Sequence, residues 1–481
     1  MNQFIGRKKE FETLRSIQKF DHACLVVVKG RRRIGKSRLI QEFAKGSRFL
    51  SFTGVVPTNG TTAQSQRDEF AKQLAKNCNA QEKTYTSWFY ALNELSSHLT
   101  NEQTIILFDE ISWMGSHDSG FVGQLKVWWD LELQEKMPNL TLIFCGSVST
   151  WIEKNILRST AFFGRVAQTI TLEQLSLSEC VEFLHASNIK ASPYDTFKLL
   201  AVTGGVPSYL GRIDKDFPIE NNIKKLCFEP DGFLTKEFND IFHDLFNGHS
   251  SAYKQVIHLL ADGMKDLQGI QEALKPDKPA SLEEVMQDLI TAGFVCGHYS
   301  WSFKTEKANT RYLYRLSDNY LRFYVKYIEP NMPQISLNDF GEKSLQNLPN
   351  WDGVMGLQVE NLLLNNRSLL VKALDIHPAD VVCHNPYRQR PSGDKKGCQI
   401  DYLLQSNSQT LYVCEFKFKR QEIGPEIIAS VQEKISRLDI PKGFGAIPVL
   451  FHFGGVKDSV RGTGYFYKII DVQDFLKTSR D

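Results

Sequence analysis

A glycine-rich segment near the N-terminus has the residue types and spacing that bind phosphate. The apolar run Leu25–Val28 precedes Gly30, and after four intervening residues come Gly35, Lys36 and Ser37. The next six residues have helical periodicity, so the loop is expected between a strand and a helix N-terminus. In such loops the backbone N–H groups surround the β- and γ-phosphates, the lysine adds a positive charge, and the hydroxyl can bind Mg²⁺. The pattern predicts a nucleoside triphosphate site.

Two carboxylates follow a second apolar strand. The run Ile105–Phe108 ends in Asp109 and Glu110. Ligands of open α/β sheets bind outside the carboxyl ends of the strands, where these acids would lie. Asp109 can hold Mg²⁺ directly or through water, and Glu110 can deprotonate the attacking water. A strand followed by a helix-capping acid is the structural alternative, but combined with the phosphate loop the pair indicates ATP hydrolysis.

Two further polar residues come near strand ends. Ser147 ends the buried strand 140–147, and we expect Ser147 or Ser149 to reach the γ-phosphate or the attacking water, with a helix N-cap as the alternative role for Ser149. Arg165 stands just before a strand predicted over residues 167–172. Arg165 is a candidate arginine finger that stabilises transferred phosphoryl charge, in its own subunit or in a neighbour's. An ordinary surface arginine is the alternative.

A second candidate site lies in the C-terminal third. Segments 399–404 and 410–417 flank a polar turn and predict a β-hairpin. Asp401 starts the first strand, whereas Glu415 and Lys417 end the second, so antiparallel pairing brings the three together. Two carboxylates and one ammonium suit a divalent metal ion held by Asp401 and Glu415, with Lys417 orienting water or stabilising phosphate charge. A solvated acid–base face is the alternative.

The motifs FIGRKKE, GRRRIGKS, ILFDEISWM, FCGSVSTW and FFGR occur in this order. They resemble the archaeal-type ATPases, which belong to the STAND group of the AAA+-like P-loop NTPases. The resemblance implies a parallel α/β sheet with an extra strand between the phosphate-loop strand and the Walker B strand, a water activated by Glu110, and Phe4–Arg7 near the base. The segment Val202–Pro207 resembles the family's GxP element, whose proline packs on the adenine. The nucleotide-binding residues expected are Gly6, Arg7, Gly30, Arg31, Arg32, Arg33, Ile34, Gly35, Lys36, Ser37, Arg38, Asp109, Ser147 and Pro207.

The C-terminal residues also resemble a known core. Glu360 in an apolar helix, Asp401, and the Glu415–Lys417 segment resemble the PD-(D/E)XK nucleases, a domain that recurs behind archaeal-type ATPases. The resemblance implies a restriction-endonuclease-like α/β fold in which Glu360, Asp401 and Glu415 are metal ligands and Lys417 is catalytic. One departure is that Gln432 is not followed four residues later by the tyrosine that some of these nucleases have, since Ser436 stands there.

The middle of the chain predicts a winged helix-turn-helix. Three helical segments, 253–260, 267–274 and 281–290, precede two strand patterns around a polar hairpin tip. The third helix contains Glu283 and Glu284, which phosphates in a DNA groove would repel. Basic residues lie instead in the wing region: Lys304, Lys307, Arg311 and Arg315. DNA contact by the wing and a rigid connector within the chain are the two interpretations.

Length and composition limit the organisation of the chain. A chain of 481 residues is too long for one core. We expect a P-loop ATPase core (1–172), a helical lid (173–245), the winged helix (246–329), a linker (330–350) and the nuclease-like domain (351–481). The net charge of +2 excludes a global basic field, so nucleic acid would need local patches. The nine scattered cysteines indicate a reducing compartment. Without an apolar stretch of ~20 residues or a signal region, we expect no membrane association and a cytoplasmic protein.

Two functions agree with these patterns. In the first, Mg²⁺-dependent ATP binding and hydrolysis act as a switch coupled to a metal-dependent nuclease-like domain acting on DNA. In the second, a regulatory ATPase carries a C-terminal domain that binds nucleic acid or protein without cleavage. Both require ATP and Mg²⁺, and both allow a homo-oligomer in which Arg165 acts on a neighbour.

Overall fold

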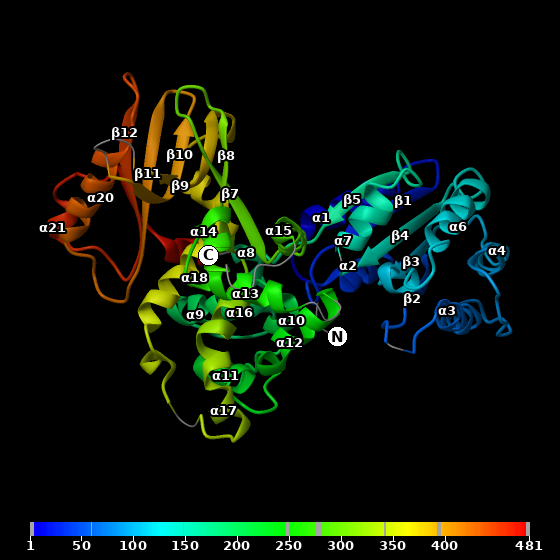
Figure 1. Cartoon of the computed structure of the whole chain (residues 1–481). Coiled ribbons are helices and arrows are strands. Elements are labelled where there is room, and N and C mark those ends of the chain that lie inside the picture. Colours follow the sequence, from blue (N-terminus) through cyan, green and yellow to red (C-terminus); the bar gives the residue numbers. More distant parts are fainter. Residues whose placement is uncertain are drawn as a thin grey trace. The chain divides into compact units, whose positions relative to one another are not determined.

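The computed structural model describes residues 4–58, 60–147, 149–246, 250–274, 281–340, 343–391 and 396–477. The chain forms two compact units (Figure 1). The first comprises Met1–Leu175, Val206–Tyr209 and Thr291–Gly293. The second comprises Ser176–Gly205, Leu210–Ile290 and Phe294–Asp481.

The first unit contains a sheet of five parallel strands in the order β2-β3-β4-β1-β5. The strands are β1 (Cys24–Lys29), β2 (Arg48–Thr53), β3 (Thr104–Asp109), β4 (Leu140–Gly146) and β5 (Val166–Thr171). Strand β4 lies between β1, which enters the phosphate loop, and β3, which ends in Asp109. The prediction of an extra strand between these two is therefore confirmed.

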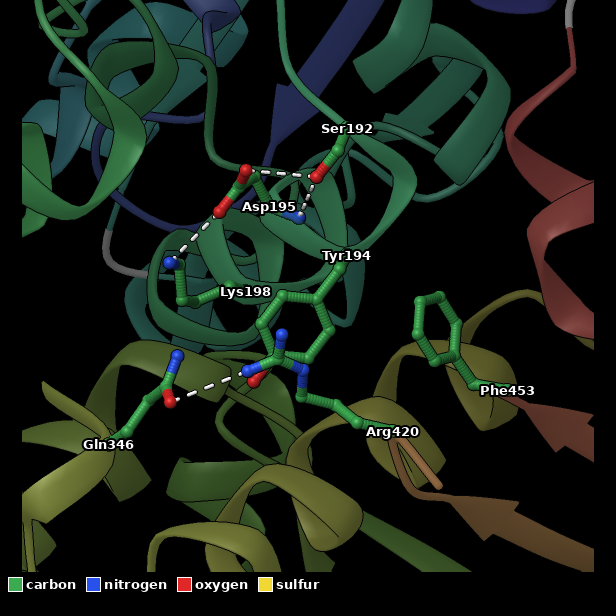
Figure 2. A pocket seen from close by; sticks show the side chains of 7 residues that line it. All are labelled: Ser192, Tyr194, Asp195, Lys198, Gln346, Arg420 and Phe453. Carbon is green, nitrogen blue, oxygen red and sulfur yellow. Dashed lines mark hydrogen bonds and ion pairs between the residues drawn. The ribbon is translucent and has the colours of Figure 1, made fainter. Parts of the chain in front are cut away.

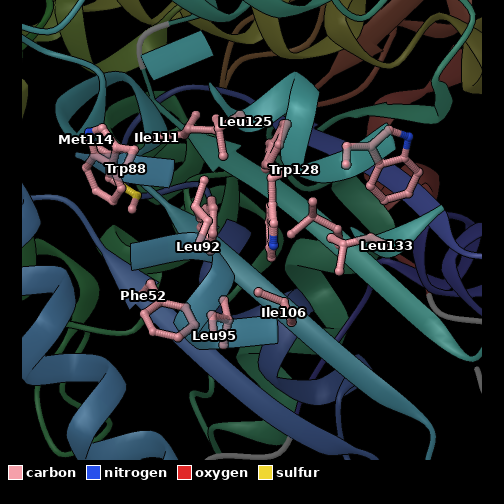
Figure 3. Close-up of a cluster of buried hydrophobic side chains, with 14 of the residues drawn as sticks. Phe52, Trp88, Leu92, Leu95, Ile106, Ile111, Met114, Leu125, Trp128 and Leu133 are labelled. Carbon is pink, nitrogen blue, oxygen red and sulfur yellow. The ribbon is translucent and has the colours of Figure 1, made fainter. Parts of the chain in front are cut away.

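Helices and two apolar clusters cover this sheet. The helices are α1 (Lys8–Ile17), α2 (Lys36–Phe43), α3 (Ala63–Cys78), α4 (Trp88–Ser97), α5 (Ile111–Met114), α6 (Phe121–Trp128) and α7 (Ser149–Ile152). Alternate residues of β1 enter different clusters, because strand side chains point to opposite faces: Val27 packs with Trp88 and Trp128, and Val28 with Leu39 of α2. Figure 3 shows the first cluster, in which Trp128 lies beside the sheet. This packing fixes the strand ends at which the polar residues lie.

The second unit begins with helices and a small sheet. The helices are α8 (Leu177–Ala186), α9 (Pro193–Thr203), α11 (Ile219–Cys227), α12 (Phe233–Phe246), α13 (Ser250–Ala261), α14 (Leu267–Ala273), α15 (Leu282–Thr291), α16 (Asn319–Phe323) and α17 (Glu329–Ser336). The sheet has the antiparallel order β6-β8-β7, with β6 (Lys265–Asp266), β7 (Val295–Trp301) and β8 (Ala308–Leu316). No helix among the described residues is long and apolar enough to cross a membrane.

A mixed five-stranded sheet forms the C-terminal part of this unit, in the order β13-β12-β11-β10-β9. The strands are β9 (Val381–Gln389), β10 (Cys398–Ser406), β11 (Thr410–Phe418), β12 (Gly445–Phe453) and β13 (Lys468–Asp471). Strands β9, β10 and β11 pair antiparallel, and β11, β12 and β13 pair parallel. The accompanying helices are α18 (Trp351–Asn365), α19 (Arg367–Ala373), α20 (Glu426–Arg437) and α21 (Asp458–Arg461). Helix α18 packs on β11, and α20 packs on β10. The predicted hairpin is confirmed as β10 and β11.

Two expectations about the middle of the chain are wrong. Residues 330–350 are not an extended linker, because α17 includes Pro330 in its first turn, where helices tolerate proline, and Phe340 is buried and stacks on Phe228. Arg315 is not an exposed basic residue of the wing. Its side chain is buried, and it donates hydrogen bonds to His298 Nε2 (3.0 Å) and Asn365 Oδ1 (2.9 Å).

Candidate ATPase site and a second acid–lysine site

The phosphate loop joins β1 to α2 as the motif predicts, and its backbone requires glycine. Gly30 has a φ of 150°, and a Cβ atom there would lie 2.4 Å from the Leu172 carbonyl oxygen. Gly35 has a φ of 93° and is the N-cap of α2. The Lys36 ammonium donates hydrogen bonds to the carbonyl oxygens of Gly30 (2.9 Å) and Arg31 (3.1 Å). The lysine therefore lies within the curve of the loop.

Ser37 and Asp109 meet although they are far apart in sequence. Ser37 Oγ donates a hydrogen bond to Asp109 Oδ2 at 2.8 Å. A hydroxyl and a carboxylate side by side at the edge of the phosphate loop are the oxygen donors that suit Mg²⁺, which keeps several water ligands of its own. The structure thus brings together the two residues predicted to hold Mg²⁺.

Glu110 is fixed by the end of the neighbouring strand β4. Its Oε2 accepts hydrogen bonds from the Ser147 backbone N–H (3.1 Å) and Oγ (2.9 Å). The Glu110 backbone has a φ of 48°, in the left-handed region that few non-glycine residues adopt. Ser147 therefore orients the carboxylate of Glu110, a contact that the sequence pattern did not indicate.

Arg7 contacts the phosphate loop through its side chain. Its buried guanidinium donates through Nη2 to the carbonyl oxygens of Ile34 (3.1 Å) and Glu173 (2.6 Å). Gly6, just before it, has a φ of 72°. The contact with Ile34 makes Arg7 a positioning residue for the phosphate loop.

Pro207 and Tyr209 lie against the same loop. The Pro207 Cγ is 3.9 Å from the point where a Cβ on Gly35 would be. Arg31 Nη2 donates a hydrogen bond to the Tyr209 hydroxyl at 3.2 Å. Sequence reasoning missed Tyr209, although it stands two residues after Pro207. The remaining predicted loop residues, Arg32, Arg33 and Arg38, lie in the loop and the first turn of α2.

Arg165 lies away from the phosphate loop. It precedes β5, whose Val166 pairs with Leu25 at the opposite end of β1 from the loop. At about 3.3 Å per residue, the strand separates Arg165 from the loop by roughly 16 Å. There its Nε and Nη2 donate to Asp130 at 2.7 and 2.9 Å. This geometry argues against an arginine finger acting in its own subunit.

The second candidate site forms at the open end of the β10–β11 hairpin. Tyr402 pairs with Cys414, and the Phe416 N–H donates to Asp401 Oδ2 at 2.9 Å. Lys417 Nζ donates to Glu415 Oε1 at 2.6 Å. The structure therefore brings Asp401, Glu415 and Lys417 together, as the hairpin pattern predicts.

A second lysine joins this group. Lys434 of α20 donates through Nζ to Glu415 Oε2 (2.5 Å) and lies 3.5 Å from Asp401 Oδ1. Sequence reasoning missed Lys434. The signal was present, because Lys434 stands three residues after Val431 and seven after Ile427, which form the buried face of α20.

Burial and charge shift the pKa values in this site. Burial and the negative charge of Asp401 raise the pKa of Glu360 to about 7, against the opposing effect of Arg315. Burial, with the charge of Glu415, also raises the pKa of Asp401. Burial lowers the pKa of Lys434, but the two acids outweigh it and the net shift is upward, so Lys434 is charged at neutral pH.

The metal ligands predicted here stay a prediction. Asp401, Glu415 and Glu360 offer the carboxylate oxygens that Mg²⁺ and Mn²⁺ prefer, so the donor chemistry fits. Among the side chains that the structure describes, however, no three Asp, Glu, His or Cys residues form a ready cage for a metal ion. Both Glu415 oxygens contact lysines instead.

Helix α9 contacts two elements that bear on this site. At its C-terminal end, the Ala201 carbonyl oxygen accepts a hydrogen bond from Gln358 Nε2 (2.6 Å), on α18 two residues before Glu360. At its N-terminal end, Tyr194 stacks on Phe418 of β11 with ring centroids 6.1 Å apart. Sequence reasoning also missed Gln358, which is fully buried.

A cavity of about 300 Å³ lies beside this N-terminal end (Figure 2). It is lined by Ser192, Tyr194, Asp195, Lys198, Gln346, Arg420 and Phe453. The Arg420 guanidinium lies 4.9 Å from the centre of the Tyr194 ring, and Lys198 Nζ is 2.9 Å from Asp195 Oδ1. The Tyr194 ring also lies 5.8 Å from the ring of Phe453, so Tyr194 joins α9 to the end of β12 and to Arg420 just after β11.

The parallel sheet and the strand–loop–helix site define a P-loop ATPase domain. Comparison with known proteins agrees: residues 4–213 match the family described as an ATPase domain predominantly from Archaea. An uncharacterized protein of Methanocaldococcus jannaschii is 22% identical over 336 residues, which cover 69% of this chain and 70% of that protein.

The chain is also similar to solved structures. The Walker-type ATPase of Pyrococcus abyssi is 15% identical, with a TM-score of 0.50, and the match covers 67% of this chain and 96% of that chain. The Aeropyrum pernix ORC2 protein, solved in ADPNP–ADP complexes, is 12% identical with a TM-score of 0.45 and coverage of 70% and 96%. The family match over residues 4–213, together with the parallel sheet and its phosphate loop, identifies a P-loop ATPase domain in this chain.

Proposed function

We propose that this chain is an ATP-dependent switch of the STAND type, coupled to a metal-dependent nuclease-like site in the C-terminal sheet that acts on DNA. The observation that carries the proposal is the position of α9. One end of this helix contacts α18 and the other contacts β11, and the chain runs on from α9 directly into Gly204–Pro207. A shift of the Pro207 segment with the state of the nucleotide would thus be transmitted to the helix that contains Glu360.

In the ATPase site, Lys36 would bind the β- and γ-phosphates, and Ser37 and Asp109 would hold Mg²⁺. Glu110, oriented by Ser147, would take a proton from the attacking water as that water adds to the γ-phosphorus and the bond to the β–γ bridging oxygen breaks. Arg165 could assist only from a neighbouring subunit, after leaving Asp130.

In the C-terminal site, Asp401 and Glu415 would hold the metal ion, with Glu360 as an additional ligand once it is deprotonated. A divalent ion bound there would supply positive charge to the scissile phosphodiester and acidify its own water. Lys417 would donate a hydrogen bond to the attacking water or to a non-bridging phosphate oxygen. The order of elements, α18 and α19, then β9, β10 and β11, then α20 and β12, supports a PD-(D/E)XK-like domain.

The elements between Ser250 and Leu316 would form a winged helix that acts as a connector. The β7 strand contacts β9 and β10 of the C-terminal sheet: Ser300 Oγ donates to the Arg388 carbonyl oxygen of β9 (3.1 Å), and Trp301 Nε1 donates to Gln405 Oε1 of β10 (2.6 Å). A wing held in this way supports an internal role better than insertion into a DNA groove.

The second candidate is a regulatory ATPase whose C-terminal domain binds nucleic acid or protein and does not cut. The observation in its favour is that lysines contact both oxygens of Glu415, the residue at the centre of the proposed metal site. The acidic residues Glu283 and Glu284 of α15 also disfavour DNA contact by that helix.

Nicking of supercoiled plasmid distinguishes the two. The purified chain is incubated with Mg²⁺ or Mn²⁺, with and without ATP, beside Asp401→Ala, Lys417→Ala and the exposed control Lys442→Ala. The nuclease proposal expects metal-dependent nicking that the first two changes abolish and the control leaves intact. If the chain does not nick the plasmid, or if Asp401→Ala and Lys417→Ala nick it as wild type does, the non-cleaving alternative is favoured.

A further inference from the structure

Lys434 of α20 contacts both acids of the C-terminal site. Its Nζ contacts one oxygen from each of the two carboxylates, Glu415 Oε2 at 2.5 Å and Asp401 Oδ1 at 3.5 Å. These two carboxylates are the ones that would hold a divalent ion in the site proposed above. Lys417 contacts the other Glu415 oxygen, Oε1, so the two lysines contact different sides of the carboxylate.

The surroundings make this ammonium an effective counter-ion. The Glu415 side chain is only 2% exposed, so water hardly solvates its charge. Two carboxylates brought together out of water repel each other and need a nearby positive charge. Lys434 itself is 25% exposed and reaches the acids on a flexible four-carbon side chain, so it can turn outward without moving α20.

We propose that Lys434 is a tethered counter-ion that competes with the divalent cation for Asp401 and Glu415 and so sets the metal affinity of this site. A metal ion at 2.0–2.6 Å from these oxygens would require the ammonium to move away, because both cannot occupy one position. Lys434 then becomes available to a phosphate group next to the metal. This inference rests on the metal site of the proposed function, and its test distinguishes the two.

The test is a Mn²⁺ titration of the full chain without nucleotide, with the uncoordinated ion measured by electron paramagnetic resonance. Four chains are compared: wild type, Lys434→Met, Lys434→Arg and the exposed-lysine control Lys442→Met. Each is also measured with Asp401→Ala, which identifies the Mn²⁺ bound at this site. Lys434→Met should bind that Mn²⁺ at least about tenfold more tightly, because a like charge a few ångströms from the ion has been removed. Lys434→Arg and Lys442→Met should stay near wild type.

Loss of folding is controlled by a second measurement. Lys434→Met removes the counter-ion of Asp401 and Glu415, so it should lower the melting temperature in the absence of metal. Adding Mn²⁺ should raise the melting temperature of Lys434→Met by more than it raises that of wild type. Equal Mn²⁺ affinity in wild type and Lys434→Met, with binding that depends on Asp401, would overturn the role of Lys434 and leave the metal site standing. Absence of Asp401-dependent binding in every chain would overturn both.

Discussion

At the scale of single residues, the hydrogen bonds between Ser147 and Glu110 predict how a substitution of Glu110 changes ATP hydrolysis. Glu110→Gln keeps the size of the side chain and can still accept the hydrogen bond from Ser147, but it cannot take a proton from water. Turnover should fall at least ~100-fold, the low end for the loss of a general base, while ATP binding persists.

Steady-state phosphate release and equilibrium binding of a fluorescent ATP analogue measure the two quantities. Lys36→Ala is the comparison variant. It removes the positive charge that contacts the phosphates, so it should lose ATP binding itself. Unchanged turnover in Glu110→Gln would refute the assignment of the base.

The buried carboxyl of Glu360 predicts a pH dependence of stability. Its pKa is raised from 4.5 to about 7, first by burial and then by Asp401, so the folded chain binds this proton more tightly than the unfolded chain does. The stabilisation is complete below pH 4.5 and is lost as the pH rises through about 7. Between these values the free energy of unfolding should fall by up to about 3 kcal/mol through this group.

Urea unfolding of wild type and Glu360→Gln between pH 5 and pH 8 measures this dependence. The amide imitates the protonated acid, so the variant should lose most of the slope and exceed wild type in stability at pH 8. The exposed residue Glu422 provides the control, as Glu422→Gln should retain the slope of wild type. Parallel curves for wild type and Glu360→Gln would contradict the raised pKa.

At the scale of elements, the phosphate loop depends on a residue outside its motif. Arg7→Ala removes both hydrogen bonds from Nη2, including the one to the Ile34 carbonyl oxygen within the loop. Since a hydrogen bond from a charged donor contributes about 1.5–3 kcal/mol, ATP affinity should fall at least about tenfold. Calorimetric titration with ATP measures this affinity, and the exposed residue Lys9 of α1, the helix that follows Arg7, gives the control Lys9→Ala. Equal affinity in the two variants would show that Arg7 does not position the loop.

The elements that the sequence predicted are those whose signals are local. Periodicity and turn residues within a short segment predict three elements: the strand–loop–helix that contains Lys36, the strand that ends in Asp109, and the β10–β11 hairpin. The 330–350 segment was misread because proline content was taken for a linker, whereas the first turn of α17 accommodates Pro330 and the fold buries Phe340.

The contacts that the sequence did not predict join distant segments. Ser147 meets Glu110 only because β4 is inserted beside β3, and Lys434 meets Asp401 only because α20 packs on β10. Local patterns do not encode such contacts. For the same reason Arg315 was counted among the basic residues of the wing region that could contact DNA, since the partners that bury it, His298 and Asn365, come from β7 and α18.

At the scale of the whole molecule, the question is how an ATPase site and an acid–lysine site in one chain can influence each other. The second unit contains a continuous set of buried polar contacts. Gln358 donates to the carbonyl oxygens of Ala201 (2.6 Å) and Asn319 (2.7 Å), and it accepts from Arg322 Nη1 (2.9 Å). Gln358 thereby joins α9, α16 and α18 at one point. A buried network of this kind has few alternative arrangements, so a displacement of α9 must either move α18 or break hydrogen bonds.

This network gives the last prediction. Gln358→Leu preserves approximate volume but removes the 2.6 Å hydrogen bond to the Ala201 carbonyl oxygen, which keeps only the 3.4 Å contact from Asn319 Nδ2, at a cost of about 1–3 kcal/mol. ATP hydrolysis should stay near wild type, since Gln358 lies in the second unit and the phosphate loop in the first. In wild type, a non-hydrolysable ATP analogue should change the hydrogen-exchange protection of α18, residues 351–365. In Gln358→Leu that change should shrink while nucleotide affinity persists.

The control is Gln268→Leu, a change of an exposed glutamine whose side chain contacts Glu272 of its own helix α14. An equal response of α18 in wild type and in both variants would show that α9 does not transmit the state of the nucleotide through Gln358.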